Sequence, residues 1–196
     1  MSEKLGLNLQ QAQELLNKYI TDPITKLHCR ESEVIMRALA DKFGENSEEW
    51  GIIGLLHDID WELTKNNTKE HCVRCIEILK ETGGTDYLIE SIISHGYANE
   101  LCGNYQNKER TTKIQHALAS AETLTGLIVA SALIQPDKKL SSVKLASLKK
   151  KFKNKSFAAN CNRDIILECE KIGLSIDEFL EIGLTALQNI SEELTL

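Results

Sequence analysis

The sequence predicts an all-α protein. Three observations indicate this fold class: apolar residues recur at intervals of three and four rather than two, glycine, asparagine, aspartate and serine cluster between the apolar runs, and alternating strand patterns are almost absent. The chain has 196 residues, of which 42% are hydrophobic and only two are proline. A chain of this length makes one domain of ordinary size, so a single helical domain over residues 1–196 is expected.

The first helices are bounded by proline and glycine. A helix over 9–19 ends before Pro23, because the residue that precedes a proline disfavours the helical conformation. A second helix over 24–43 ends at Gly44, which adopts a left-handed cap at low cost. A third helix opens at Ser47, and the two glutamates that follow suit the positive end of the helix dipole.

The later helices follow the same signals. The apolar helix expected over 112–134 should cross the whole domain and lie at its centre. Residues 96–110 form the longest irregular stretch, and because long loops often serve as lids or binding segments, this loop is a candidate substrate edge. The other expected helices cover 68–82, 85–94, 142–152, 162–172 and 176–194.

Charge and composition argue against several classes of protein. The net charge of −6 argues against a partner that is a nucleic-acid polymer. The first residues lack the layout of a secretory signal, and nowhere do about eighteen apolar residues run together. We therefore expect a cytoplasmic protein without a membrane partner, whose six cysteines remain thiols. Cys72 and Cys75 form one CxxC pair, a weak zinc signal by itself, and we expect both on a helix flank.

The segment GLLHDIDWE at 54–62 places His57 and Asp58 directly after an apolar run. A polar group buried without a partner costs on the order of 2 to 7 kcal/mol, and a lone carboxylate costs more. One metal ion would satisfy both side chains. Because adjacent residues on a helix point about 100° apart, both can face one ion only if the helix ends there, at about Ile59. The alternative is an exposed His57 and an Asp58 that caps the next turn.

Imidazole is the commonest side-chain ligand for transition metals, and carboxylates complete sites for harder ions. The fifth histidine, His116, lies on the long apolar helix and is expected to pack rather than to bind metal. The remaining histidines and two carboxylates are the candidate metal ligands: His28, His57, Asp58, His71, His95 and Glu122.

Three of these candidates have another reading. His71 is compatible with an exposed position on a helix, and His95 suits a helix carboxyl terminus for dipole reasons alone. Glu122 interrupts an apolar face, where it is able to pair with Arg110 or Lys113 instead of a metal.

The order and spacing of these residues resemble the HD-domain superfamily of metal-dependent phosphohydrolases. The resemblance covers roughly residues 24–134, and the segments GIIGLLHDID and LTGLIVASALI are similar to the uncharacterised bacterial group of HDIG-type hydrolases. It implies an HD-domain helical bundle with its core over about 24–134 and a carboxy-terminal helical extension over about 135–196.

The resemblance also implies a ligand set with a shared aspartate. One ion is held by His28, His57, Asp58 and Glu122, and a second by Asp58, His71 and His95. The late acid of the family is usually aspartate, and Glu122 is one methylene longer, so it can shift the ion or reach it through water. The resemblance leaves the metal open: one or two divalent ions of iron, manganese, nickel, zinc or magnesium.

The implied reaction is hydrolysis of a phosphate ester or anhydride of a small molecule such as a nucleotide. Two ions about 3.5 to 4 Å apart activate water and clamp the phosphoryl oxygens. His57 and Asp58 are the catalytic candidates, with Asp58 placed to orient the water. The motifs HExxH, GxxxxGK[ST] and GxGxxG are missing, so no organic cofactor is expected.

Two other functions remain open. The first is a non-catalytic nucleotide- or metal-binding sensor with the same fold, and the second is an all-α scaffold in which the histidines are incidental. The oligomeric state and the substrate are left open. The cations nearest to the expected site by sequence are Lys65, Lys69, Lys108, Arg110 and Lys113.

Overall fold

The structure, a computed structural model, describes residues 4–99 and 102–194. Every regular element in these ranges is a helix, which confirms the all-α class. The elements are α1 (Leu9–Tyr19), α2 (Pro23–Phe43), α3 (Ser47–Leu56), α4 (Trp61–Thr64), η1 (Thr68–Glu70), α5 (Arg74–Glu81), α6 (Asp86–Ile93), η2 (Ser94–Gly96), α7 (Lys113–Leu133), η3 (Leu140–Ser142), α8 (Leu145–Lys153), α9 (Arg163–Ile166), η4 (Leu167–Ile172), α10 (Ile176–Gln188) and α11 (Ser191–Leu194), where η marks a 3₁₀ helix.

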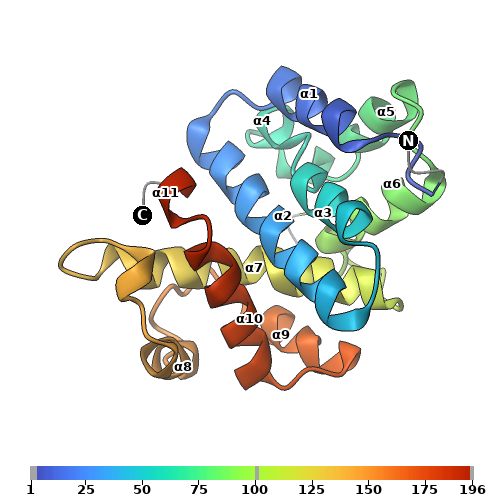
Figure 1. The fold of residues 1–196 in the computed structure, drawn as a ribbon. Coiled ribbons are helices and arrows are strands. Elements are labelled where there is room, and N and C mark those ends of the chain that lie inside the picture. Colours follow the sequence, from blue (N-terminus) through green and yellow to red (C-terminus); the bar gives the residue numbers. More distant parts are fainter. Residues whose placement is uncertain (1–3, 100–101, 195–196) are drawn as a thin grey trace.

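Helix α7 lies at the centre of the molecule, as its apolar sequence predicts. It crosses α2 and α3, and the carboxy-terminal elements α8, α9, η4 and α10 pack against it (Figure 1). By length and composition α7 is apolar enough to cross a membrane, but 67% of its most apolar window is buried inside the protein. This is the burial of a core helix.

The bounds of α1 and α2 agree with the sequence. Helix α2 begins at Pro23, whose missing N–H costs nothing in the first turn, and the Asp22 carboxylate caps the helix by accepting the N–H of Thr25 at 2.8 Å. The helix ends at Gly44, which has the left-handed φ of 68° that the sequence predicts for it.

Helix α3 packs tightly on α2 and ends where the candidate ligands begin. A Cβ atom at Gly54 would lie 2.8 Å from the Ser32 carbonyl oxygen on α2, so the close approach of the two helices requires glycine here. Asn46, rather than Ser47, is the N-cap. The helix ends at Leu56, slightly before the expected Ile59, and residues 57–60 form a turn. That early end allows His57 and Asp58 to face the same side.

The prediction of a helix over 68–82 is wrong for the amino-terminal part of this range. A 3₁₀ turn covers Thr68–Glu70, and α5 begins only at Arg74. Tertiary contacts to Asp60 explain the difference, because one carboxylate oxygen binds the His71 ring at 2.8 Å and the other accepts the N–H of Cys75 at 3.0 Å. These bonds hold 71–73 outside the helix.

Three carboxy-terminal helices also differ from their expected ranges. Ser142 donates its hydroxyl to Asp137 at 2.6 Å, so it belongs to a turn and α8 starts at Leu145. The helix expected over 162–172 becomes a 3₁₀ helix from Leu167.

The range 176–194 is split between α10 and α11. The chain turns at Asn189, a residue of modest helix propensity. This turn buries Leu194 and brings Glu193 to within 2.8 Å of Arg30 on α2.

Candidate metal centre

The first group of ligands forms where α2 meets the end of α3. His28 lies on α2, and its Nε2 atom is 3.0 Å from Nε2 of His57. The Asp58 carboxylate completes the group, with Oδ2 at 3.7 Å from His28 Nε2 and Oδ1 at 3.6 Å from His57 Nε2. We call His28, His57 and Asp58 the first triad.

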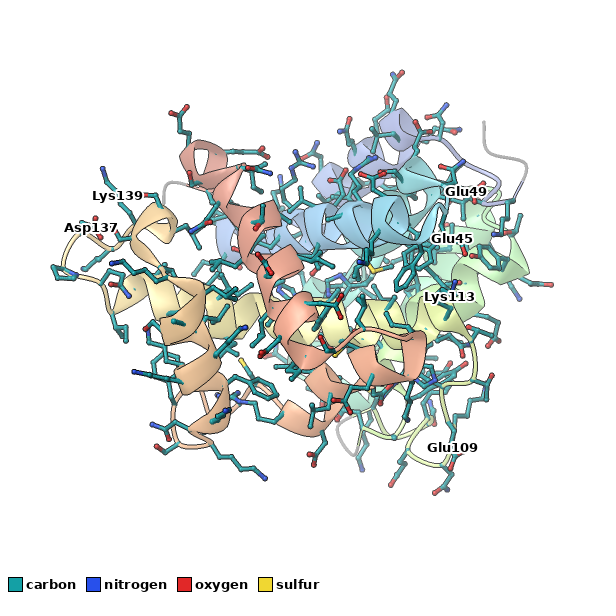
Figure 2. The ribbon with its side chains drawn as sticks, turned by 60° about the horizontal axis from the view of Figure 1, so that its bottom comes forward. Glu45, Glu49, Glu109, Lys113, Asp137 and Lys139 are labelled. Atoms are coloured by element: carbon teal, nitrogen blue, oxygen red, sulfur yellow. The ribbon has the colours of Figure 1, made fainter. Side chains whose placement is uncertain are left out.

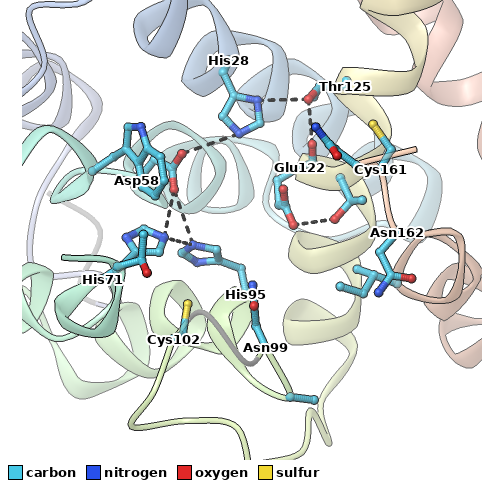
Figure 3. A pocket seen from close by; sticks show the side chains of 17 residues that line it. His28, Asp58, His71, His95, Asn99, Cys102, Glu122, Thr125, Cys161 and Asn162 are labelled. Carbon is cyan, nitrogen blue, oxygen red and sulfur yellow. Dashed lines mark hydrogen bonds and ion pairs between the residues drawn. The ribbon is translucent and has the colours of Figure 1, made fainter. Parts of the chain in front are cut away.

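A second triad shares the same aspartate. The Nε2 atoms of His71 and His95 lie 3.0 Å apart, and Asp58 Oδ1 lies 3.4 Å from the first and 3.5 Å from the second (Figure 3). Within each triad the three ligand atoms lie within 4.8 Å of one another. The structure thus brings together five of the six predicted ligands, with Asp58 between two histidine pairs.

The other ring nitrogen of His57 and of His95 faces a backbone carbonyl. Nδ1 of His57 is 2.8 Å from the Gly54 oxygen, and Nδ1 of His95 is 2.6 Å from the Ile92 oxygen. A carbonyl oxygen only accepts hydrogen bonds, so Nδ1 carries the proton in both rings. In the neutral imidazole the Nε2 atom then presents a lone pair to the triad.

His28 and His71 are oriented by side chains instead. Nδ1 of His28 lies 3.0 Å from the Thr125 hydroxyl oxygen, whose own proton goes to the Glu122 carbonyl at 2.7 Å. Nδ1 of His71 lies 2.8 Å from the buried Asp60 carboxylate. Both rings therefore donate through Nδ1 and point Nε2 at the centre. The sequence interpretation missed Thr125 and Asp60, although an aspartate two residues after Asp58 in an apolar segment was a signal.

This arrangement fits divalent metal ions. Two unprotonated nitrogens held 3.0 Å apart repel each other unless a cation or a proton is bound by both. Histidines that bind metal almost always donate their other ring N–H to a carboxylate, a backbone carbonyl or water. The fixed orientation of all four rings is the one that metal binding requires.

Without a cation the two triads titrate differently. Burial lowers the pKa of His57 to about 3. Burial also opposes protonation of His71, but hydrogen bonds to Asp58 and Asp60 outweigh it and raise the pKa of this histidine to about 10. Burial would raise the pKa of Asp58, yet the histidines around it hold that pKa well below its usual range. Asp58 is therefore an anion, the form in which a carboxylate binds a metal ion.

Glu122 lies apart from both triads. It lines the same cavity, and its carboxylate accepts the Thr123 hydroxyl proton at 2.6 Å. Burial raises the pKa of Glu122. Neither of the cations that offered an alternative pairs with it, since Arg110 binds Glu168 at 2.7 Å and Lys113 reaches Glu45 at 3.5 Å (Figure 2). Metal binding by Glu122 stays a prediction.

His116 is engaged elsewhere, in agreement with the expectation that it packs. It is buried, and its Nδ1 atom lies 2.6 Å from the Glu168 carboxylate. Arg110 binds the same carboxylate and also the carbonyl oxygens of Ser94 and Tyr97 at 2.9 and 2.8 Å. This network joins η4 to α7 and to the loop expected over 96–110, of which residues 100 and 101 lie outside the described residues.

One wall of a cavity of about 890 Å³ is formed by four of the five triad residues, His28, Asp58, His71 and His95 (Figure 3), whereas His57 is buried. The opposite wall comes from the carboxy-terminal part of the chain: Asn160, Cys161, Asn162 and Ile165. No lysine or arginine is among its described lining residues, so none of the five cations that the sequence placed near the site lines it. Metal ions would be the main source of positive charge in this cavity.

Arg163 holds that opposite wall in shape. Its guanidinium is buried and donates to backbone carbonyls at the end of α8 and in the loop that follows it: Phe152, Asn154, Phe157, Ala158 and Cys161. Buried carbonyl oxygens need such donors. One side chain therefore organises the loop that carries Asn160 and Asn162 into the cavity.

The cysteines do not follow the CxxC interpretation. Cys75 lies on α5, but Cys72 precedes that helix and has a left-handed φ of 65°. The Cys75 thiol donates to the Cys72 carbonyl oxygen at 3.3 Å. The sulfur of Cys72 instead lies beside that of Cys102, and both are within 4.8 Å of a ring nitrogen of His71. All six cysteines are free thiols.

Fold and site together define an all-α protein with a cluster of histidines around an aspartate that could hold divalent metal ions. The model of the HD domain family matches residues 26–132, more than half of the chain, and the protein belongs to this family. HD domains are in general metal-dependent phosphohydrolases that bind divalent ions. Comparisons with curated proteins and with solved structures gave no match. The narrower HDIG-type group remains a prediction.

Proposed function

We propose that this HD-domain protein hydrolyses a phosphate ester or anhydride of a small molecule, and that its substrate is a nucleotide. The observation that carries the proposal is the shared aspartate: Asp58 lies between two histidine pairs, and it lines a cavity of about 890 Å³ together with His28, His71 and His95. Cavities that bind small molecules measure about 300 to 1,000 Å³. A second triad would be redundant in a protein that only needs one ion for its fold.

The first triad would hold one divalent ion and the second triad another. Bound ions of this kind make water more acidic and neutralise the charge that develops on a transferred phosphoryl group. Asp58 contributes a carboxylate that stays anionic and reaches both positions. His57 is almost fully buried and keeps a neutral ring, so it does not compete with the water for protons. The fixed rings supply the preorganisation that such a reaction needs.

The charge of the cavity favours a substrate with few phosphates. Each phosphate of a di- or triphosphate needs a cation, and proteins usually provide lysine or arginine for it. The described lining offers neither. It offers the side-chain amides of Asn99, Asn160 and Asn162 and the ring of Trp61, groups that suit a neutral polar body with a planar face. A nucleoside monophosphate combines these features.

A substrate panel tests the proposal. Purified protein is freed of metal, reloaded separately with each divalent ion, and assayed with p-nitrophenyl phosphate and with nucleoside mono-, di- and triphosphates. We expect turnover with the monophosphates foremost, and its loss in His57→Ala and Asp58→Ala while the far-ultraviolet circular dichroism stays unchanged. Turnover of triphosphates in preference to monophosphates would contradict the argument from charge.

The same panel separates the hydrolase from a sensor. The position of Glu122 outside the triads is the observation that favours a sensor, because a missing ligand would leave the first ion weakly held. A sensor binds a nucleotide with micromolar affinity or better and releases it intact under every ion tested. The hydrolase releases phosphate at a rate that follows metal occupancy.

A further inference from the structure

Cys72 is held beside the second triad by an unusual backbone conformation. Its φ of 65° lies in the left-handed region, which costs a residue other than glycine about 1 to 2 kcal/mol. This conformation follows His71 directly and turns the Cys72 sulfur to 3.6 Å from Nε2 of His95. Strain of this kind persists at functional sites, where the surrounding structure fixes it.

A second thiol reaches the same place from a distant part of the chain. The Cys102 sulfur, the Cys72 sulfur and a ring nitrogen of His71 all lie within 4.8 Å of one another. The two thiols meet over the backbone of Gly96, where a Cβ atom would lie 2.6 Å from the first sulfur and 3.1 Å from the second. Figure 3 shows the Cys102 sulfur pointing toward the rings of His71 and His95.

The distance between Cys72 and His95 matches that between two ligands of one ion. Zinc binds histidine nitrogen at about 2.0 to 2.1 Å and cysteine sulfur at about 2.3 Å, so the two atoms lie about 3.6 Å apart when their bonds to the ion meet at about the tetrahedral angle. The distance from the Cys72 sulfur to His95 Nε2 is 3.6 Å. The first triad has no thiol among its members.

We propose that Cys72 and Cys102 are ligands of the second ion, which makes that position a nitrogen–sulfur site for a borderline-soft ion such as Zn²⁺, in preference to Mg²⁺ or Mn²⁺. The inference rests on the two-ion centre of the proposed hydrolase. Thiolates and imidazoles together select zinc, whereas carboxylates and water suit magnesium and manganese. Each thiol that binds the ion releases its proton to solvent.

Cobalt provides a readout that does not depend on turnover. The reduced, metal-free full-length protein is titrated with Co²⁺ under anaerobic conditions, and a sulfur-to-cobalt charge-transfer band is followed in the near ultraviolet. We expect a band that saturates with metal and disappears when Zn²⁺ is added. Cys72→Ser and Cys102→Ser should each weaken it, and the double variant should lack it.

Two matched variants serve as controls. Cys161→Ser removes a thiol from the opposite wall of the same cavity, and Cys75→Ser removes the other half of the CxxC pair. Both should keep the band. A wild-type protein that binds Co²⁺ without the band overturns the inference, as does a band that survives in the folded double variant or is lost in Cys75→Ser alone.

Competition with a chelator completes the test. The double variant should lose about 10- to 100-fold or more in Zn²⁺ affinity, at least the effect of losing an outer-shell partner, while its Mn²⁺ affinity stays the same. An equal loss for both ions overturns the inference. Turnover without the cobalt band would leave the hydrolase standing and remove this site, whereas a band without turnover of any phosphate compound would do the reverse.

Discussion

The two triads differ in the exposure and the orienting partner of one histidine each, His28 in the first and His71 in the second. In the first triad the His28 side chain is 29% exposed to the cavity and its ring is oriented by the neutral hydroxyl of Thr125. In the second triad His71 is 8% exposed and its ring is oriented by the carboxylate of Asp60, with the thiols of Cys72 and Cys102 close by. Only Asp58 belongs to both.

This difference indicates a division of labour within one centre. A site with charged and soft partners is suited to retain its ion, whereas a site whose outer histidine, His28, is more exposed is suited to exchange water and substrate. The shared aspartate couples the two. Substitutions of single residues at this centre should therefore affect the two ions differently.

The largest effect is expected from the shared ligand. Asp58→Asn removes the charge that both positions need, so metal content should fall for both ions. Metal stabilisation of the transition state is worth several kcal/mol, and each 1.36 kcal/mol is tenfold in rate, so kcat should fall about a thousandfold. Metal analysis and steady-state kinetics check this, with the distant, exposed Asp137→Asn as control (Figure 2). Loss of one ion only would show that Asp58 does not bridge.

A smaller effect is expected from the residues that orient the rings. Loss of an outer-shell partner costs about 10- to 100-fold in metal affinity. Asp60→Asn should lower the affinity for the second ion by about 100-fold, because a hydrogen bond to a charged acceptor is about twice as strong as one to a neutral acceptor. Thr125→Val should lower the affinity for the first ion by about tenfold.

Chelator competition on both variants, ion by ion, measures the contrast. If Asp60→Asn and Thr125→Val weaken the same ion equally, the two halves of the centre are not independent. His116→Asn, which alters a buried histidine bound to Glu168, controls for general loosening of α7.

A smaller loss of metal affinity is expected from substitution of Glu122. If this residue takes the place of the family's late aspartate through a water, Glu122→Gln should weaken the first ion about tenfold, near the lower limit for an outer-shell partner, and leave the second unchanged. Glu122→Asp should restore part of the loss if the shorter acid suits the site. Unchanged affinity for both ions in Glu122→Gln would remove this residue from the ligand set.

The last prediction concerns the stability of the metal-free protein and not its metal affinity. The folded pKa of His71 is raised to about 10 from the ordinary 6.5, so its contribution is fully present below pH 6.5 and is lost as the pH rises through about 10. One pKa unit is about 1.36 kcal/mol, so a few kcal/mol at most are involved. His57 behaves oppositely, because its folded pKa is lowered and stability is lost as the pH falls from 6.5 toward 3.

Urea unfolding in the presence of a chelator measures this dependence. The difference in unfolding free energy between wild type and His71→Gln should shrink across the range from pH 6.5 to 10. Adding Zn²⁺ should abolish the alkaline loss, since a bound ion requires the neutral ring. A constant difference across the range would mean that His71 is neutral in the metal-free protein.

Local signals predicted the elements that local forces determine. Helices α1, α2 and α7 agree with their expected ranges because caps such as Asp22 and Gly44 act within a few residues. The segment 68–73 was predicted wrongly because its conformation depends on Asp60, a partner that no periodicity within the segment reveals. The hydrogen bonds to Asp60 outweighed the local preference of this segment for a helix.

The site shows the same limit. The histidines and Asp58 were recognisable because their order resembles a known family, and their convergence follows from the fold. The orienting groups Thr125 and Asp60 were missed, and the CxxC spacing drew attention to Cys75 when the structural neighbour of Cys72 is Cys102. Spacing in the chain is a poor guide to thiol pairs when a left-handed residue turns one of them away.

The loop that Arg163 holds in place forms the far wall of the cavity, where it would contact part of the substrate. The HD match ends at residue 132, yet the loop that this arginine organises lines the same cavity as the candidate metal ligands from beyond that boundary. In the proposed hydrolase, part of the surface that would recognise the substrate therefore lies outside the stretch that carries the candidate metal ligands. Exchanging residues 152–172 for those of a relative would change the preference for the leaving group, while the candidate metal ligands stay unchanged.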